Sequence, residues 1–193
     1  MTTDSATDTS PDPDEGPIGR DAVVAAVLEH AADLFAERGP AATSIRDIAK
    51  RAGVNHGLVF RHLGAKEQLV AAVLNHLADQ TALRVAAGPV SAGDPTMRRQ
   101  WTVLARAILD GYPVGELQQH FPTVDRVVEQ ARKHHPDERS ADLAAANALA
   151  LVLGWQLFEP FLRFATGLQD VPEPELRSAI ETAAASVMGL PRP

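Results

Sequence analysis

Residues 43–66 read Thr-Ser-Ile-Arg-Asp-Ile-Ala-Lys-Arg-Ala-Gly-Val-Asn-His-Gly-Leu-Val-Phe-Arg-His-Leu-Gly-Ala-Lys, and this stretch decides the fold. Ser44 followed three residues later by Asp47 is a capping-box pattern, in which each residue satisfies a backbone N–H that the first helical turn leaves unpaired. The pattern predicts a helix that begins near Ile45. Gly53 predicts the end of that helix, because glycine readily takes the left-handed conformation that often follows a last helical turn.

A second helix is predicted directly afterwards. Asn55 is a favourable N-cap for a helix over residues 56–62, and the spacing of Val59 and Leu63 points both side chains inward. Two short helices joined by a few residues that include glycine form a helix-turn-helix, which places its second helix in the major groove of DNA. An ordinary pair of packed helices has the same spacing, so this pattern alone leaves both interpretations open.

The surrounding motifs favour DNA binding. They are Ile48-Ala49, Ala52-Gly53-Val54, Gly57, His62 and Lys66-Glu67-x-Leu69. Together they resemble the DNA-binding segment of the tetracycline-repressor (TetR) family of one-component regulators. The resemblance covers roughly residues 20–80, and the rest of the chain only by helix number and length. It implies a three-helix DNA-binding domain joined by a long helix to a larger helical domain that binds ligand and dimerises.

The resemblance and the position of residues on the two helices imply a set of DNA contacts. His62 matches the phosphate-contacting histidine of the family and Lys66 its backbone-contacting lysine, while Arg61 is expected to read guanine or bind phosphate. Phe60 stands where relatives usually have tyrosine and lacks the hydroxyl that would bind phosphate. The predicted DNA-binding residues are Ser44, Arg46, Asn55, His56, Gly57, Leu58, Phe60, Arg61, His62 and Lys66.

Some of these residues have a second interpretation. Ser44 can cap its helix or donate to a phosphate, and Arg46 can contact DNA or remain a solvated surface residue. Leu58, if exposed, suits contact with a thymine methyl group, and if buried it belongs to the core. Gly57 lets the backbone approach DNA closely or is simply tolerated within its helix.

The 193-residue chain has a net charge of −7 that is unevenly distributed. Residues 1–17 contain five acidic and no basic residues, residues 18–70 six acidic and seven basic, and residues 71–193 fourteen acidic and eleven basic. The basic residues of the middle segment can form a local face that attracts phosphate. We therefore expect a disordered acidic tail (1–17), a DNA-binding domain (18–65) and a ligand-binding and dimerisation domain (66–193).

Composition also indicates where the protein acts. The chain has no cysteine, which suits a reducing compartment and excludes zinc–thiolate sites and thiol nucleophiles. Its N-terminus is acidic rather than signal-like, and no apolar run reaches the roughly 20 residues of a membrane span. A cytoplasmic protein without a membrane partner is expected.

Beyond the quoted stretch, helical periodicity recurs and no strand-like alternation occurs, so the predicted fold class is all-α. Pro160 is expected to kink or break the helix that contains it. The other helices are expected at residues 21–38, 66–86, 96–110, 114–120, 123–134, 139–165 and 173–188.

Aromatic residues spread over several helices of the second half suggest an apolar pocket between those helices, although aromatics at helical spacing also form ordinary cores. Few ionisable residues interrupt the apolar runs, so the expected effector is hydrophobic or weakly polar. The predicted ligand-binding residues are Trp101, Tyr112, Phe121, Trp155 and Phe158.

Residues 144–155 are apolar except for Asn147, which one buried helical face does not explain. Such a helix is buried on several sides, either in a monomer core or between the core and a partner subunit. The family resemblance implies that the last two helices pair with their copies in a four-helix dimer interface. The predicted interface residues are Leu149, Leu153, Gln156, Ile180, Ala184 and Val187.

The sequence contains no HExxH, Glu-x-x-His pair, Walker loop, GxSxG or GxGxxG motif, so no enzyme, cofactor or metal site is predicted. His134-His135 with His120 is more simply explained as exposed histidines. The resulting hypothesis is a homodimeric repressor that binds a pseudo-palindromic double-stranded DNA operator and is released by a small hydrophobic molecule. The alternatives are a helical ligand-binding protein without sequence-specific DNA binding, or an all-α enzyme without recognisable motifs.

Overall fold

The structure is a computed structural model that describes residues 19–88, 90 and 93–190. Within these residues the chain forms helices and no strand, so the predicted all-α fold class is confirmed. The predicted acidic tail, residues 1–17, lies outside the described residues. The helices are α1 (Arg20–Arg38), α2 (Ile45–Arg51), α3 (His56–Leu63), α4 (Lys66–Ala86), α5 (Pro95–Leu109), α6 (Val114–Leu117), α7 (Pro122–Arg132), α8 (Glu138–Thr166) and α9 (Glu173–Val187).

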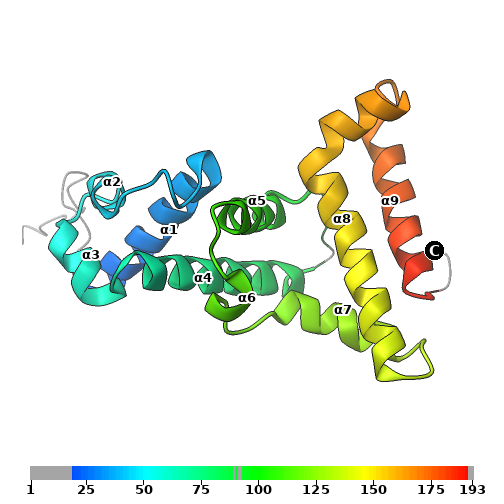
Figure 1. The fold of residues 1–193 in the computed structure, drawn as a ribbon, viewed down its shortest axis with the longest axis horizontal. Coiled ribbons are helices and arrows are strands. Elements are labelled where there is room, and N and C mark those ends of the chain that lie inside the picture. The colour runs from blue at the N-terminus through cyan, green and yellow to red at the C-terminus, as the bar shows by residue number, and fades with distance from the viewer. Residues whose placement is uncertain (1–18, 89, 91–92, 191–193) are drawn as a thin grey trace, which may run out of the picture.

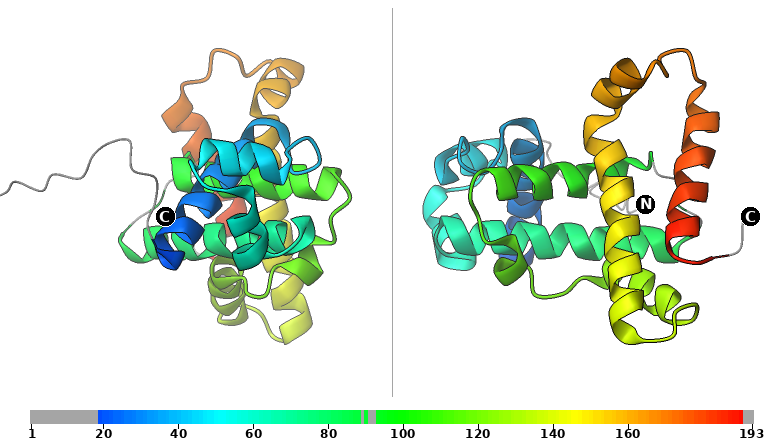
Figure 2. Two further views of the ribbon diagram at one scale, coloured as in Figure 1. Left: turned by 90° about the vertical axis from the view of Figure 1, so that its left-hand side faces the viewer. Right: turned by 45° about the vertical axis from the view of Figure 1, so that its right-hand side comes forward.

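Helix α4 runs along the molecule and connects its two ends (Figure 1). Helices α1, α2 and α3 gather around the start of α4, and α5 packs beside both α1 and α4. Helices α8 and α9 lie side by side at the far end, where α7 packs against α8 (Figure 2). The helix-turn-helix is therefore held at the opposite end of the molecule from α8 and α9.

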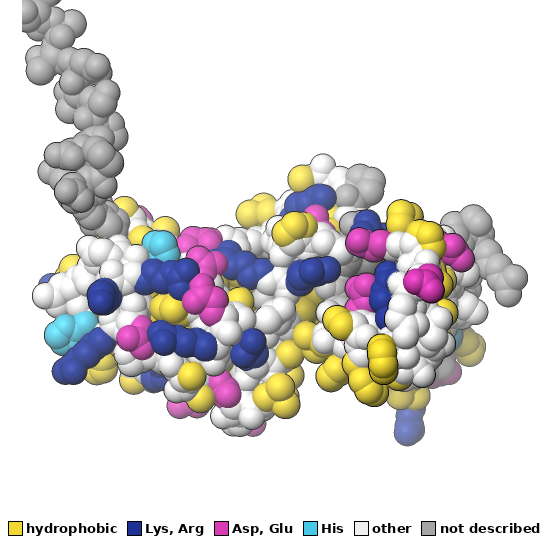
Figure 3. Space-filling view, turned by 90° about the horizontal axis from the view of Figure 1, so that it is seen from above, with side chains coloured by type: hydrophobic (Ala, Val, Ile, Leu, Met, Phe, Trp, Pro, Cys, Tyr) yellow, Lys and Arg dark blue, Asp and Glu magenta, His cyan; other side chains and the backbone are white. Residues whose placement is uncertain are grey.

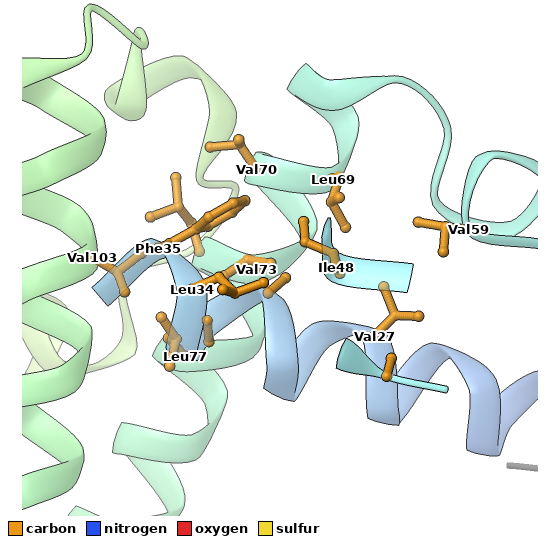
Figure 4. Packing of buried hydrophobic residues seen from close by; sticks show 14 of the residues in the cluster. Val27, Leu34, Phe35, Ile48, Val59, Leu69, Val70, Val73, Leu77 and Val103 are labelled. Atoms are coloured by element: carbon orange, nitrogen blue, oxygen red, sulfur yellow. The ribbon is translucent and has the colours of Figure 1, made fainter. Parts of the chain in front are cut away.

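One apolar core fills the first half of the molecule (Figure 4). It encloses the large side chains Phe35, Ile48, Leu69 and Leu77, which come from α1, α2 and α4. Their helical spacing places them on the inner faces of these amphipathic helices, so burial stabilises all of them together. The core also includes residues of α5 and α6, and so crosses the domain boundary predicted after residue 65. That division of the chain remains a prediction.

Local hydrogen bonds explain the predicted helix ends. Ser44 Oγ accepts from the Asp47 backbone N–H at 3.1 Å, and Asp47 Oδ2 accepts from the Ser44 N–H at 3.0 Å, which completes the capping box. Gly53 has a φ of 66°, the left-handed conformation expected of it. Asn55 caps α3 by accepting from the Gly57 N–H at 2.8 Å. Helix α4 begins after Ala65 without a side-chain cap, since neither Gly64 nor Ala65 has a side chain that accepts a hydrogen bond.

Several predicted boundaries in the second half were wrong by one to three residues. Helix α5 begins at Pro95 because Asp94 accepts from the Thr96 N–H at 3.0 Å, a cap followed by proline that the sequence already contained. Helix α6 was expected to reach residue 120 but ends at Leu117. Gln118 is extended there, and its side chain donates to the His120 carbonyl at 2.9 Å.

Helix α8 continues through Pro160 to Thr166, so the proline does not break it. The helix bends over its last turns (Figure 1). Its buried residues are only Ala141, Ala144, Ala145 and Ala148. The interpretation of α8 as a helix buried on several sides in a monomer core is therefore wrong, and its burial against a partner subunit stays a prediction.

The same helix corrects a second expectation. By length and composition α8 is apolar enough to cross a membrane, and only 22% of its most apolar 18-residue window is buried within the chain. The expectation from the sequence was that no apolar run reaches the length of a membrane span. One helix of this kind is weak support for a membrane segment, since the core helix of a soluble protein passes the same test.

Candidate DNA-binding surface and small-molecule cavity

Two ion pairs fix α2 against the end of α1. Arg38 Nη2 lies 3.1 Å from Asp47 Oδ2, and Arg51 Nη1 lies 2.7 Å from Glu37 Oε1. Hydrogen bonds from Ser44 and the charge of Arg38 keep the pKa of Asp47 below its usual value, so its carboxylate stays ionised in the capping box. These pairs were not predicted. They orient α2, and through it α3, relative to the rest of the molecule.

The structure brings several of the predicted DNA-binding residues to one surface. Arg46, His56, Phe60 and Arg61 are exposed, and Phe60 is 61% exposed. An open depression between α2 and α3 is lined by Ser44, Ile45, Arg46, His56, Gly57 and Phe60. Figure 3 shows basic and histidine side chains at this end of the molecule, with acidic side chains among them.

Three other predicted residues have structural roles within the helix-turn-helix. Leu58 is partly buried against the core, which favours its core interpretation over an exposed methyl contact. Asn55 Oδ1 is engaged as the α3 cap, and a Cβ on Gly57 would lie 3.2 Å from that oxygen. A glycine at this position therefore leaves the cap uncrowded. His62, at the end of α3, is partly exposed.

Lys66 points inward, which its sequence position did not indicate. Its ammonium donates to the Thr43 carbonyl and lies 4.6 Å from the centre of the Phe35 ring. Burial lowers the pKa of Lys66 to about 8, against the opposing effect of the Asp47 and Asp110 carboxylates. The side chain thus connects the first turn of α4 to the chain just before α2.

A cavity of about 460 Å³ lies in the second half, between α5, the α6–α7 segment and α8. Predicted ligand-binding residues Trp101, Tyr112 and Phe121 all line it. Sequence reasoning missed most of the wall, because aromatic content alone does not select aliphatic and amide residues. The other lining residues are Gln100, Leu104, Ile108, Val114, Gly115, Gln118, Pro122, Thr123, Val124, Leu149 and Leu153.

The remaining two predicted ligand-binding residues lie elsewhere. Trp155 borders a small crevice between α8 and α9, and Phe158 lies on an outer groove with 58% of its surface accessible. Both residues are on α8, but neither lies on the side of α8 that lines the cavity.

The six predicted interface residues are also divided. Leu149 and Leu153 line the cavity, and Ile180 is 8% exposed. Gln156 lies in the crevice between α8 and α9, and Ala184 packs against the alanine cluster of α7 and α8. Of the large apolar residues in the set, Val187 has the most exposed side chain, at 40%.

Helix α5 joins the cavity to the DNA-binding end. Arg99 donates to the Glu29 carboxylate, the Glu29 carbonyl and Asp33 of α1, each at 2.8 Å. At the other end of α5, Asp110 Oδ2 accepts from the Ala41 N–H at 2.7 Å. The cavity-lining residues Gln100, Trp101, Leu104 and Ile108 belong to the same helix.

Glu29 is the centre of the cluster on α1. Besides Arg99, it accepts from His76 at 2.8 Å and from Gln80 of α4. Partial burial raises its pKa, but the hydrogen bonds and the Arg99 charge outweigh that effect and lower the pKa of Glu29 to about 2. One carboxylate thus links α1, α4 and α5.

No cluster of three or more His, Cys, Asp or Glu side chains suited to a metal ion occurs among the described residues. His120 and His135, which the sequence suggested as part of a possible metal site, contact different residues. His120 pairs with Asp79 at 2.6 Å, and His135 contacts the Met188 carbonyl at 3.2 Å.

A capped helix-turn-helix held at one end of an all-α chain defines the class of helix-turn-helix transcriptional regulators. The model of the family described as "Bacterial regulatory proteins, tetR family" matches residues 27–73. The HTH-type transcriptional repressor Rv3405c of Mycobacterium tuberculosis (strain H37Rv) is 51% identical over 189 residues, which cover 97% of this chain and 98% of that protein. This chain belongs to the TetR family.

Two further comparisons agree. The HTH-type transcriptional repressor KstR2 of M. tuberculosis (strain H37Rv) is 38% identical over 114 residues, covering 59% of this chain and 57% of KstR2. The crystal structure of a TetR-family protein from Rhodococcus sp. has a TM-score of 0.61 at 20% identity, and covers 86% of this chain and 98% of its own, which supports the fold. The protein is a DNA-binding transcriptional regulator and not an enzyme.

Proposed function

We propose that this regulator is a homodimeric repressor that binds a pseudo-palindromic operator and leaves it when a small, mainly apolar molecule occupies the cavity beside α5. The observation that carries the proposal is the position of α5. One helix supplies part of the cavity wall and also contacts α1 through Arg99 and the α1–α2 connection through Asp110. DNA binding implies a cytoplasmic location.

For DNA recognition we propose that α3 enters the major groove, with Arg46, His56, Phe60, Arg61 and His62 toward DNA. The exposure of Arg46, His56, Phe60 and Arg61 supports this assignment. Three of these residues, Arg46, His56 and Phe60, also line the depression between α2 and α3. Ser44, Asn55, Gly57 and Leu58 would act mainly by shaping that surface, since the first two are engaged as caps. Lys66 would support the surface from within, through its contacts with the Thr43 carbonyl and the Phe35 ring.

A titration against a panel of genomic duplexes at several salt concentrations tests operator binding. Each phosphate that a protein neutralises contributes roughly 0.9 to the slope of log affinity against log salt. Arg61→Ala should weaken binding to every duplex and reduce that slope by about 1 if Arg61 binds phosphate. Arg139→Ala removes an exposed arginine at the far end and serves as the control. Binding without preference for any duplex would support the alternative of a ligand-binding protein without sequence-specific recognition.

For dimerisation we propose the outer face of α8 together with α9. Leu143, Leu157, Phe161 and Phe164 recur at helical spacing along one side of α8 and remain between 37% and 75% exposed. An apolar face of this length on a soluble DNA-binding protein needs a partner. A second copy satisfies it, and a two-fold dimer also presents two reading helices to two half-sites.

The contacts of α5 suggest how a ligand in the cavity changes the position of the DNA-binding helices. A molecule that fits the cavity better in one position of α5 shifts the population toward that position. The Arg99 and Asp110 contacts then move α1, and Glu29 passes the same displacement to α4. The measurement is DNA affinity with and without a bound compound. Equal affinities in the two states would contradict the coupling, because coupling between two sites is reciprocal.

A further inference from the structure

Helix α3 buries all but one of its large apolar side chains. Leu58, Val59 and Leu63 belong to the first core or pack against it, whereas Phe60 is 61% exposed. Among the described residues of α1, α2 and α3, Phe60 is the one large apolar side chain that is exposed. The sequence offered Leu58 for contact with a thymine methyl group, but the structure leaves Phe60 as the apolar residue available to DNA.

Phe60 lies on the reading side of the helix-turn-helix. It lines the open depression between α2 and α3 together with Ile45 and Arg46 of α2 and His56 and Gly57 of α3. His56 and Gly57 precede Phe60 by four and three residues, so the three residues share one face of α3. A recognition helix contacts base edges with its N-terminal residues, which places this face toward the major groove in the proposed complex.

Gly57 leaves room on the same face, one turn before the ring. Of the described side chains other than those of its two neighbours in the chain, only that of Asn55 comes within 4 Å of the point where a Cβ of Gly57 would lie. The edge of a base can therefore approach α3 beside Phe60 without displacing a side chain at position 57.

The chemistry of a phenyl ring limits what Phe60 can recognise on DNA. The ring has no N–H or O–H donor and no oxygen acceptor, so it offers neither a phosphate contact nor a conventional hydrogen bond to a base edge. In the major groove the base pairs display hydrogen-bonding groups and, at thymine alone, a methyl group at C5. Contact between the ring and that methyl group removes apolar surface of both partners from water, which favours thymine at this position.

We propose that Phe60 is a specificity-determining residue that selects thymine at one position in each operator half-site, through contact of its ring with the C5 methyl group. Ile45 adds partly buried apolar surface to the same depression, while Arg46 and His56 supply polar groups beside it. The inference rests on the proposed function, because it names the base that the proposed reading surface recognises.

Removing single methyl groups from DNA tests the contact with the native chain. A preferred duplex is first selected from a pool of random sequences, and each thymine in turn is then replaced by deoxyuridine, which lacks only the methyl group. One thymine in each half-site should stand out, with an affinity about fourfold lower, the effect of one buried methyl group. Replacing both should lower the affinity about fifteenfold. Fluorescence anisotropy at constant salt measures these affinities.

The variant Phe60→Ala identifies the residue responsible. It should bind the thymine and deoxyuridine duplexes equally, because no ring remains to contact the methyl group. Leu83→Ala removes a side chain that is 72% exposed on α4 and should keep the native preference for thymine. Both substitutions are at exposed positions, and far-UV circular dichroism establishes that each variant is folded.

The proposal is overturned if no deoxyuridine substitution weakens binding, as expected of a ring that packs only against deoxyribose. It is also overturned if Phe60→Ala keeps the native sensitivity to the methyl group, since another residue then makes the contact. Both results leave the proposed operator binding standing, because a preferred duplex has been found. A selection that yields no preferred duplex would contradict the proposed function together with this inference.

Discussion

The two ends of this molecule bury their large apolar side chains in different places. At the DNA-binding end, Phe35, Ile48 and Leu69 are enclosed within the chain itself. At the other end the buried cluster consists of alanines and Met188, while Phe161 and Phe164 remain 66% and 75% exposed. The first end therefore encloses its large side chains within the chain, whereas the second leaves its largest ones exposed, where we propose that a second copy covers them.

The largest expected effect tests the enclosed end. Phe35→Ala removes a fully buried ring and should lower the free energy of unfolding by about 3–5 kcal/mol, because of lost burial and the cavity left behind. It also removes the ring beneath the Lys66 ammonium. Chemical denaturation followed by circular dichroism measures the loss. Phe164→Ala, made in the exposed region and studied at high dilution, should change it by less than about 0.5 kcal/mol.

The next effect tests the open end. Phe161→Glu should weaken dimerisation by about a hundredfold or more, because two-fold symmetry buries the charge twice without a partner. Analytical ultracentrifugation gives the dissociation constant. Leu83→Glu, on α4 at a site that is 72% exposed, is the matched control and should leave the dimer intact. An unchanged mass for Phe161→Glu would remove α8 from the interface.

A smaller effect concerns the cluster between the two ends. Lowering the pKa of Glu29 from 4.5 to about 2 stabilises the fold above pH 4.5, and this contribution disappears as the pH falls from about 4.5 to about 2. The full shift corresponds to about 3 kcal/mol, and solvent screening of a side chain that is 40% exposed reduces it to about 1–2 kcal/mol.

Glu29→Gln should therefore lose about 1–2 kcal/mol of stability at pH 7 and show a flatter decline in stability between pH 4.5 and pH 2. Urea denaturation across that range is the measurement. A variant whose stability falls as steeply with pH as that of the native chain would show that other carboxylates control acid unfolding.

The smallest effect lies within the helix-turn-helix. Ser44→Ala removes one side of the capping box and should cost about 1 kcal/mol, since the Asp47 N–H then loses its partner. Ser178→Ala, on the outer face of α9, changes the same atoms at an exposed position and should be nearly neutral. Equal unfolding midpoints for the two variants would argue that solvent replaces the cap.

The sequence predicted the first half more accurately than the second. Caps, glycine conformations and the α4 start depend on residues close together in the chain, and so the ends of α2 and α3 could be predicted. The cavity depends on four separate segments, and only Trp101, Tyr112 and Phe121 among its residues were anticipated. Trp155 is as aromatic as Trp101, but it lies on a different face of its helix from the cavity-lining Leu149 and Leu153.

By itself, therefore, the sequence determined the all-α fold, the helix-turn-helix and the family, because these follow from residues within a few turns of each other. Tertiary structure alone decided that Lys66 turns inward, that Leu149 and Leu153 face a cavity, and that Arg99 connects the cavity helix to α1. The physical reason is that helical periodicity defines which residues share a face, whereas packing between distant helices decides what that face meets.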